Sequence, residues 1–83
     1  MSYHVYEPET VRALSQALAA GMDYIERTAP KALLFRGRSA VTKALVASLL
    51  KAADSGETDP ERLRAVALEW AAAHFQAPES RVA

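Results

Sequence analysis

The sequence has no cysteine, and its 83 residues include only three glycines and six aromatic side chains. Without cysteine there can be no disulfide, no thiolate nucleophile and no cysteine-ligated zinc, and this composition is typical of the reducing cytoplasm. Hydrophobic residues make up 51% of the chain, but 18 of them are alanines, so few bulky side chains remain for a core. Since a domain this small buries only about 60% of its surface, we expect a second copy to cover part of it, in a homodimer.

Net charge is lacking as well, because ten Lys and Arg residues balance ten Asp and Glu residues. Domains that bind nucleic acid usually carry a basic excess, and this total provides none. Apolar runs are far shorter than the roughly 20 residues that span a bilayer, and residues 1–8 lack the basic start and apolar stretch of a signal peptide. We therefore expect a cytoplasmic protein with no membrane partner.

Side chains that carry chemistry do not cluster in the sequence. The two histidines, His4 and His74, are seventy positions apart, and no acidic residue precedes His74 by three or four positions. There is no spaced set of metal ligands and no glycine-rich phosphate loop. We expect no enzyme activity, no cofactor and no metal site, and we expect His74 to be a partly buried residue at a helix end.

The apolar spacing predicts a long first helix. It begins at Pro8, which suits the first helical position, and it ends before Pro30. Gly21 inside it costs about 1 kcal/mol relative to alanine, so it indicates either a closely packed partner backbone or a weak point. The predicted buried face repeats every three or four residues: Val11, Leu14, Leu18, Met22 and Ile25.

Two further main helices are predicted, joined as an antiparallel hairpin because the loop between them is short. The second follows Ser39 as N-cap and ends at Gly56 as a left-handed C-cap, and the third begins at Pro60 after Asp59 as N-cap. The second helix has a wide apolar arc, formed by Val41, Leu45, Val46, Leu49, Leu50, Ala52 and Ala53.

The predicted fold class is all-α, a small three-helix bundle with an extended N-terminal arm and the first helix laid across the hairpin. Residues 1–7 form the arm, which either lies over the helices or pairs as a short strand with a second copy, residues 8–75 form one domain, and residues 76–83 form a disordered tail. Residues 31–38 read KALLFRGR, and we expect a turn or two of helix there with Leu33, Leu34 and Phe35 turned inward.

Charge is segregated along the chain although it sums to zero. Residues 1–30 carry −2, residues 31–51 carry +5 and residues 52–83 carry −3. The basic segment is either balanced by acidic neighbours or forms a contact for an acidic protein partner or another anion. Its candidate contact residues are Arg36, Arg38 and Lys43.

Apolar side chains on the third helix extend over more than one of its faces. We expect either the N-terminal arm or a second copy to cover them. The candidate interface residues are Leu68, Trp70 and Phe75.

A strand-like start, Pro8 followed by Val11, and Gly37-Arg38-Ser39 opening a helix resemble the ribbon-helix-helix repressors, whose dimers read DNA with paired strands. This resemblance implies a small dimeric DNA-binding regulator that uses the basic segment 31–51. The 28 residues between Pro8 and Gly37 are more than that family's first helix requires.

A second resemblance covers roughly two-thirds of the chain, in EPETVRAL at residues 7–14, VASLL at 46–50 and AADSGETDPERLR at 52–64. These segments are similar to small uncharacterised bacterial all-helical proteins that open with PETV...AL and end with GE.DP.RLR. The resemblance implies the fold and no activity, because the family has no assigned chemistry. From the residues we expect a non-enzymatic protein-interaction or oligomerisation module of unknown pathway, with the DNA-binding regulator as the alternative.

Overall fold

The computed structural model describes residues 6–75, which fold into four helices. They are α1 (Pro8–Thr28), α2 (Pro30–Arg36), α3 (Arg38–Asp54) and α4 (Pro60–His74). Residues 6–75 contain no strand, so the all-helical prediction is confirmed. The predicted tail and the first five residues of the predicted arm lie outside the described residues.

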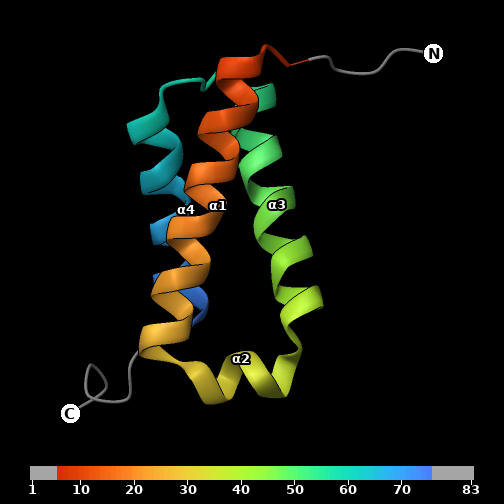
Figure 1. Ribbon diagram of the computed structural model, residues 1–83, viewed down its shortest axis with the longest axis vertical. Coiled ribbons are helices and arrows are strands. Elements are labelled where there is room, and N and C mark those ends of the chain that lie inside the picture. Colours follow the sequence, from red (N-terminus) through yellow and green to blue (C-terminus); the bar gives the residue numbers. More distant parts are fainter. Residues whose placement is uncertain (1–5, 76–83) are drawn as a thin grey trace.

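The three longer helices stand side by side, and the short helix α2 crosses one end of the molecule (Figure 1). The chain runs along α1, turns through α2, returns along α3 and runs back along α4, so α3 and α4 are antiparallel while α1 and α4 are parallel. The first helix therefore lies alongside α4, whereas the sequence predicted that it would be laid across the hairpin. Small residues on both helices allow this close parallel contact.

Three of the four helices begin with proline, because a first helical residue needs no backbone N–H and proline already has a helical φ. The start of α3 differs from the prediction that Ser39 is its N-cap. Gly37 holds that position with φ +92°, and the helix begins at Arg38. Only glycine adopts such a φ without strain, so the backbone conformation, rather than a side-chain cap, sets this start.

The end of α3 agrees with the prediction. Gly56 has φ +106°, its N–H donates to the carbonyl of Ala53, and the N–H of Glu57 donates to the carbonyl of Ala52. These two bonds form a Schellman cap, which satisfies carbonyls that the helix leaves free. Asp59 occupies the N-cap position of α4, although its side chain makes no capping hydrogen bond.

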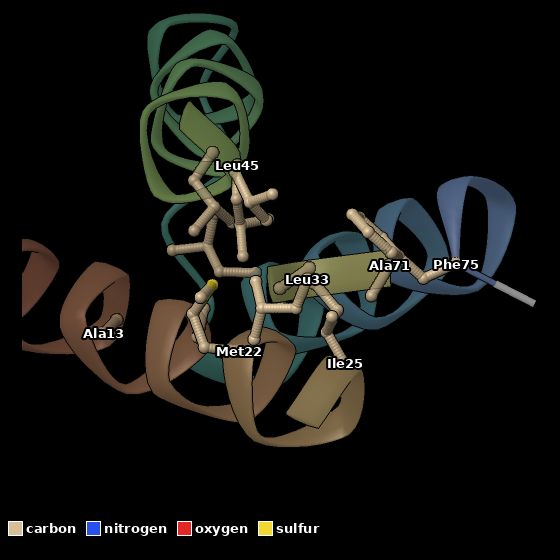
Figure 2. Close-up of a cluster of buried hydrophobic side chains, with 12 residues drawn as sticks. Ala13, Met22, Ile25, Leu33, Leu45, Ala71 and Phe75 are labelled. Atoms are coloured by element: carbon tan, nitrogen blue, oxygen red, sulfur yellow. The ribbon is translucent and has the colours of Figure 1, made fainter. Parts of the chain in front are cut away.

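The core is centred on small residues where α1 meets α4. Ala17, Ala67 and Ala71 are fully buried, and Gly21 is buried beside them. A Cβ added at Gly21 would lie 3.3 Å from the Cβ of Ala67 and 2.8 Å from Cδ2 of Leu45. Gly21 therefore marks a closely packed helix contact, which is the first of the two explanations that the sequence left open. Figure 2 shows this buried cluster, to which α2 contributes Leu33 and the position after α4 contributes Phe75.

The buried face of α1 is rotated from the predicted one. Met22 and Ile25 are buried as expected, but Leu14 and Leu18 are only half-buried, and Val11 is 48% exposed. The buried stripe instead passes through the alanines and Gly21, since small side chains let α4 approach closely while the larger ones are left on the side of α3. The sequence prediction was wrong because it ranked the bulky residues above the small ones.

The prediction for α2 was wrong at two of three positions. Leu33 is buried, but Leu34 is 84% exposed and Phe35 is 91% exposed. Successive residues of a helix point about 100° apart, so a short helix that lies across the end of a bundle can bury only one of three consecutive side chains.

Candidate functional site

An apolar groove of about 170 Å³ lies between α1 and α3. Its floor includes Leu49, which is buried, while Val11 and Leu50 at its mouth are 48% and 37% exposed. Within residues 6–75 nothing covers this side of the two helices, whereas α4 lies behind them (Figure 1). The lining residues are Val11, Leu14, Ser15, Leu18, Val46, Leu49 and Leu50.

Charged residues border the groove at both of its ends. Along α3, Lys43 precedes Val46 by three positions and Asp54 follows Leu50 by four, so both lie on the stripe that faces the groove. Along α1, Arg12 lies almost one turn before Ser15, and Glu26 lies about three turns after it. Each helix thus borders the groove with one cation and one carboxylate. On α1 the carboxylate is the one nearer to α2, and on α3 the cation is the one nearer to α2.

The carboxylate of Asp54 joins α3 to the residue before α1. The hydroxyl of Tyr6 donates a hydrogen bond to Oδ1 of Asp54. This bond, together with partial burial and the negative charge of Asp54, raises the pKa of Tyr6 above its usual value of 10.0. The contact fixes the entry of the chain into α1 next to the mouth of the groove.

A second hollow, of about 310 Å³, brings together residues from both predicted sites. The guanidinium of Arg36 lies 4.8 Å from the centre of the Phe75 ring, a cation–π contact. The Trp70 ring stacks on His74 with 4.4 Å between centroids and tilts against Phe75 at 6.1 Å. Arg36 is therefore placed beside Trp70 and Phe75, which the sequence analysis had assigned to a separate site. The remaining lining residues are Ala40, Val41 and Ala44.

His74 is exposed rather than partly buried as the sequence predicted. Its Nδ1 lies 2.9 Å from the backbone carbonyl of Trp70. Because a carbonyl oxygen only accepts, Nδ1 must carry the proton in this contact. Of the described side chains, none provides a carboxylate partner for the ring, and no three His, Asp or Glu residues among positions 6–75 are grouped to hold a metal ion.

The other predicted contact residues are spread over the molecule. Arg38 forms an ion pair with Glu26 of α1, on the other side of α3 from Arg36. Lys43 is exposed at the border of the groove. The three candidate cations therefore do not converge on one anion site.

The predicted apolar interface is divided in the same way. Phe75 is 2% exposed and belongs to the core. Leu68 and Trp70 are both half-buried, and two positions correspond to about 200° around a helix, so they lie on opposite sides of α4. Trp70 and Phe75 line the hollow beside Arg36, and Leu68 does not.

A third concavity, of about 650 Å³, lies at the end of the molecule opposite α2. It is open and lined mainly by exposed polar side chains, and every buried polar side-chain atom of the described residues has a hydrogen-bond partner. Its lining residues are Tyr6, Glu7, Glu9, Thr10, Arg12, Ala13, Gln16, Thr58 and Pro60.

Searches against protein-family models, curated proteins and solved structures each found no match to this chain. The resemblance to small bacterial helical proteins therefore stays a prediction. Across positions 6–75, the helices are too short or too polar to cross a bilayer.

Proposed function

We propose that this protein is a non-enzymatic oligomerisation module in which two copies associate through the groove between α1 and α3. The observation that carries the proposal is the groove itself, in which five large aliphatic side chains of two helices lie together and only partly covered. They are Val11, Leu14, Leu18, Val46 and Leu50. The small core supports it further, since the described chain buries alanines and leaves these larger side chains at the surface.

A second copy fits the groove because the same surface on both partners can pair about a two-fold axis. Facing grooves would bring α1 and α3 of each copy together as four helices around a shared apolar centre, an arrangement that helix bundles use widely. Val11 and Leu50 at the mouth of one groove would then lie against the corresponding side chains of the other. This burial is worth about 25 cal/mol for each Å² of apolar surface removed from water.

The charges that border the groove are complementary between two copies. We place the two-fold axis along the helices, so that α1 of each copy faces α3 of the other, Arg12 faces Asp54 and Lys43 faces Glu26. An axis perpendicular to the helices would instead pair each helix with its own reversed mate. Asp54 and Glu26 already bind Tyr6 and Arg38 within the chain, but a carboxylate has two oxygens and can accept several hydrogen bonds. Opposite charge thus supports a second copy as the occupant of the groove.

The proposal includes a cytoplasmic location, which the lack of cysteine supports. It leaves the wider pathway open.

The molecular mass in solution, measured by light scattering over a range of concentrations, tests the proposal. We expect a dimer for the wild-type chain and a monomer for Leu50→Glu, which puts a charge into the groove without removing a core side chain. Leu34→Glu is the matched control, because it makes the same change at a more exposed leucine outside the groove. A wild-type monomer at all concentrations, or a dimer that both variants retain, would contradict the proposal.

The DNA-binding alternative can be separated with the same proteins. A regulator must bind random duplex DNA at low salt, with an affinity that falls steeply as salt rises. The oligomerisation module should show no such binding. Loss of duplex binding in Arg36→Ala with Arg38→Ala would favour the regulator.

A further inference from the structure

The end of the molecule formed by α2 carries two large apolar side chains that almost nothing covers. Leu34 is 84% exposed and Phe35 is 91% exposed, while the neighbouring Leu33 is buried and holds α2 against the core. Since α2 crosses the end of the bundle (Figure 1), this exposed pair belongs to the end surface and not to the groove between α1 and α3. A rigid helix therefore presents an apolar pair at one end of the protein.

Cations surround this apolar pair. Lys31 precedes Phe35 by four positions, so the two side chains lie on the same face of α2. Arg36 follows directly, and residues 31–53 contain no acidic side chain. On the half of α1 next to α2, Asp23 and Glu26 form ion pairs with Arg27 and Arg38, and the charges within each pair cancel. Glu69 of α4 is exposed, and it offsets one of the two cations of α2, so this end keeps a positive charge.

The opposite end of the molecule has the reverse character. Of the carboxylates on described residues, six lie near the start of α1 and the loop between α3 and α4. They are Glu7, Glu9, Asp54, Glu57, Asp59 and Glu61. Four cations at the same end, Arg12, Lys51, Arg62 and Arg64, offset four of these charges and leave a net negative charge there. The molecule is therefore modestly polarised along its length, and its basic end also carries the exposed apolar pair.

We propose that the α2 end docks on an anionic lipid surface, with Leu34 and Phe35 entering the interfacial region and Lys31 and Arg36 lying beside the lipid phosphates. A combination of aliphatic or aromatic side chains with flanking cations is what binding at a membrane interface requires. The opposite charge of anionic headgroups attracts the basic end and repels the acidic end, so it also sets the orientation. This contact lies on the surface of the bilayer and involves no membrane-spanning helix.

A lipid surface fits this end better than a protein does. A stable protein interface usually buries about 800 Å² on each partner, whereas α2 has seven residues and exposes two large apolar side chains. A bilayer sets no such minimum area, because single side chains can enter it between headgroups. The sequence analysis predicted no membrane partner, because the apolar runs are short, and it placed Leu34 and Phe35 inward. The inferred lipid contact departs from that prediction.

Sedimentation with vesicles tests this inference on the full chain. The probe vesicles are phosphatidylcholine alone and phosphatidylcholine mixed with phosphatidylglycerol. We expect binding to the mixed vesicles that weakens as salt rises, and much weaker binding to the neutral ones. The double variant Leu34→Ser with Phe35→Ser should bind at least about tenfold more weakly, because burial of one such side chain alone is worth about an order of magnitude.

Matched controls separate the α2 end from general effects. Lys31→Gln with Arg36→Gln should weaken binding to the mixed vesicles, while Lys51→Gln, which removes an exposed lysine outside both the α2 end and the groove, should have a smaller effect. Circular dichroism should show that the double serine variant keeps its helices, because the replaced side chains lie in solvent.

Three results would overturn the inference. They are the absence of wild-type binding to the mixed vesicles, equal binding of the double serine variant, and a loss of dimer mass in that variant without any vesicle binding by the wild type. The last result would assign the apolar pair to contact with a second copy. None of them depends on whether Leu50→Glu splits the dimer, so the lipid inference and the proposed oligomerisation can fail separately.

Discussion

Gly21 of α1 lies directly against Ala67 of α4, so that a Cβ on Gly21 would approach the Ala67 Cβ to 3.3 Å and Cδ2 of the buried Leu45 to 2.8 Å. Gly21→Ala should therefore destabilise the fold by about 1 to 3 kcal/mol, although alanine gains about 1 kcal/mol in helix propensity. Ala67 has no flexible side chain that could move away. The measurement is the free energy of unfolding in urea.

A control for this variant is Ala19→Gly, which removes a Cβ at an exposed site of the same helix. It should cost about 1 kcal/mol through propensity alone. If Gly21→Ala were more stable than the wild type, the contact between α1 and α4 would have to be looser than the geometry shows.

The half-buried Trp70 packs on Phe75 and stacks on the exposed His74. We expect Trp70→Ala to lower the free energy of unfolding by about 2 to 3 kcal/mol, less than the roughly 3 to 5 kcal/mol of a fully buried aromatic ring. His74→Ala should cost under about 1 kcal/mol, since it removes one exposed stacking partner. Urea unfolding followed by circular dichroism compares the two variants, and equal losses would mean that the stack, rather than the contact with Phe75, stabilises this end of α4.

The hydrogen bond from Tyr6 to Asp54 predicts a pH dependence at alkaline pH. The folded state raises the pKa of Tyr6 above 10.0 through this bond, so it holds the phenolic proton more tightly than the unfolded chain does. The resulting stability is fully present below about pH 10 and is lost as the pH rises through the higher pKa of the folded state.

Melting temperatures of the wild type and Tyr6→Phe, measured across this range, test the linkage. Lysines titrate in both proteins, so the difference between the two curves isolates Tyr6. We expect the difference to shrink above pH 10. A constant difference would show that Tyr6 contributes only packing.

The helix ends could be predicted from the sequence because they depend on local chemistry. Pro8, Pro30 and Pro60 each start a helix, and Gly56 ends one with a positive φ. The predicted N-cap Ser39 lies two positions too late, since Gly37 takes the capping position with its backbone alone.

The buried faces could not be predicted to the same degree, because two apolar stripes compete on α1. One consists of large aliphatic residues, and the other consists of Ala13, Ala17 and Gly21. The small residues stabilise the fold only when another helix packs closely against them, and the sequence of α1 alone does not show that. The exposure of Phe35 could not be predicted either, since it depends on the direction in which α2 crosses the bundle. The contact of Arg36 with the Phe75 ring is a tertiary contact with no local signal in the sequence.

The charges that border the groove give a prediction for the proposed dimer. Lys43→Glu would place a glutamate against Glu26 of the other copy, and the two-fold axis repeats this like-charge contact once more in the dimer. The dimer dissociation constant should therefore rise about tenfold. The double variant Lys43→Glu with Glu26→Lys should recover part of the affinity. Sedimentation equilibrium measures the constants, with Arg64→Glu on α4 as a control for the same change of charge. Equal weakening by the control would contradict the facing arrangement of Lys43 and Glu26.

The same orientation predicts that dimerisation strengthens lipid binding. A two-fold axis along the helices places both α2 ends at one end of the dimer, so that both can reach the same bilayer and bind it with avidity. Leu50→Glu should then weaken binding to anionic vesicles as it splits the dimer. Leu50 lies about 18 Å along α3 from Arg38, and its added charge is screened from the bilayer beyond about 8 Å at physiological salt. A Leu50→Glu monomer that binds vesicles as tightly as the wild-type dimer would contradict the common-end arrangement, because each α2 end would then act alone.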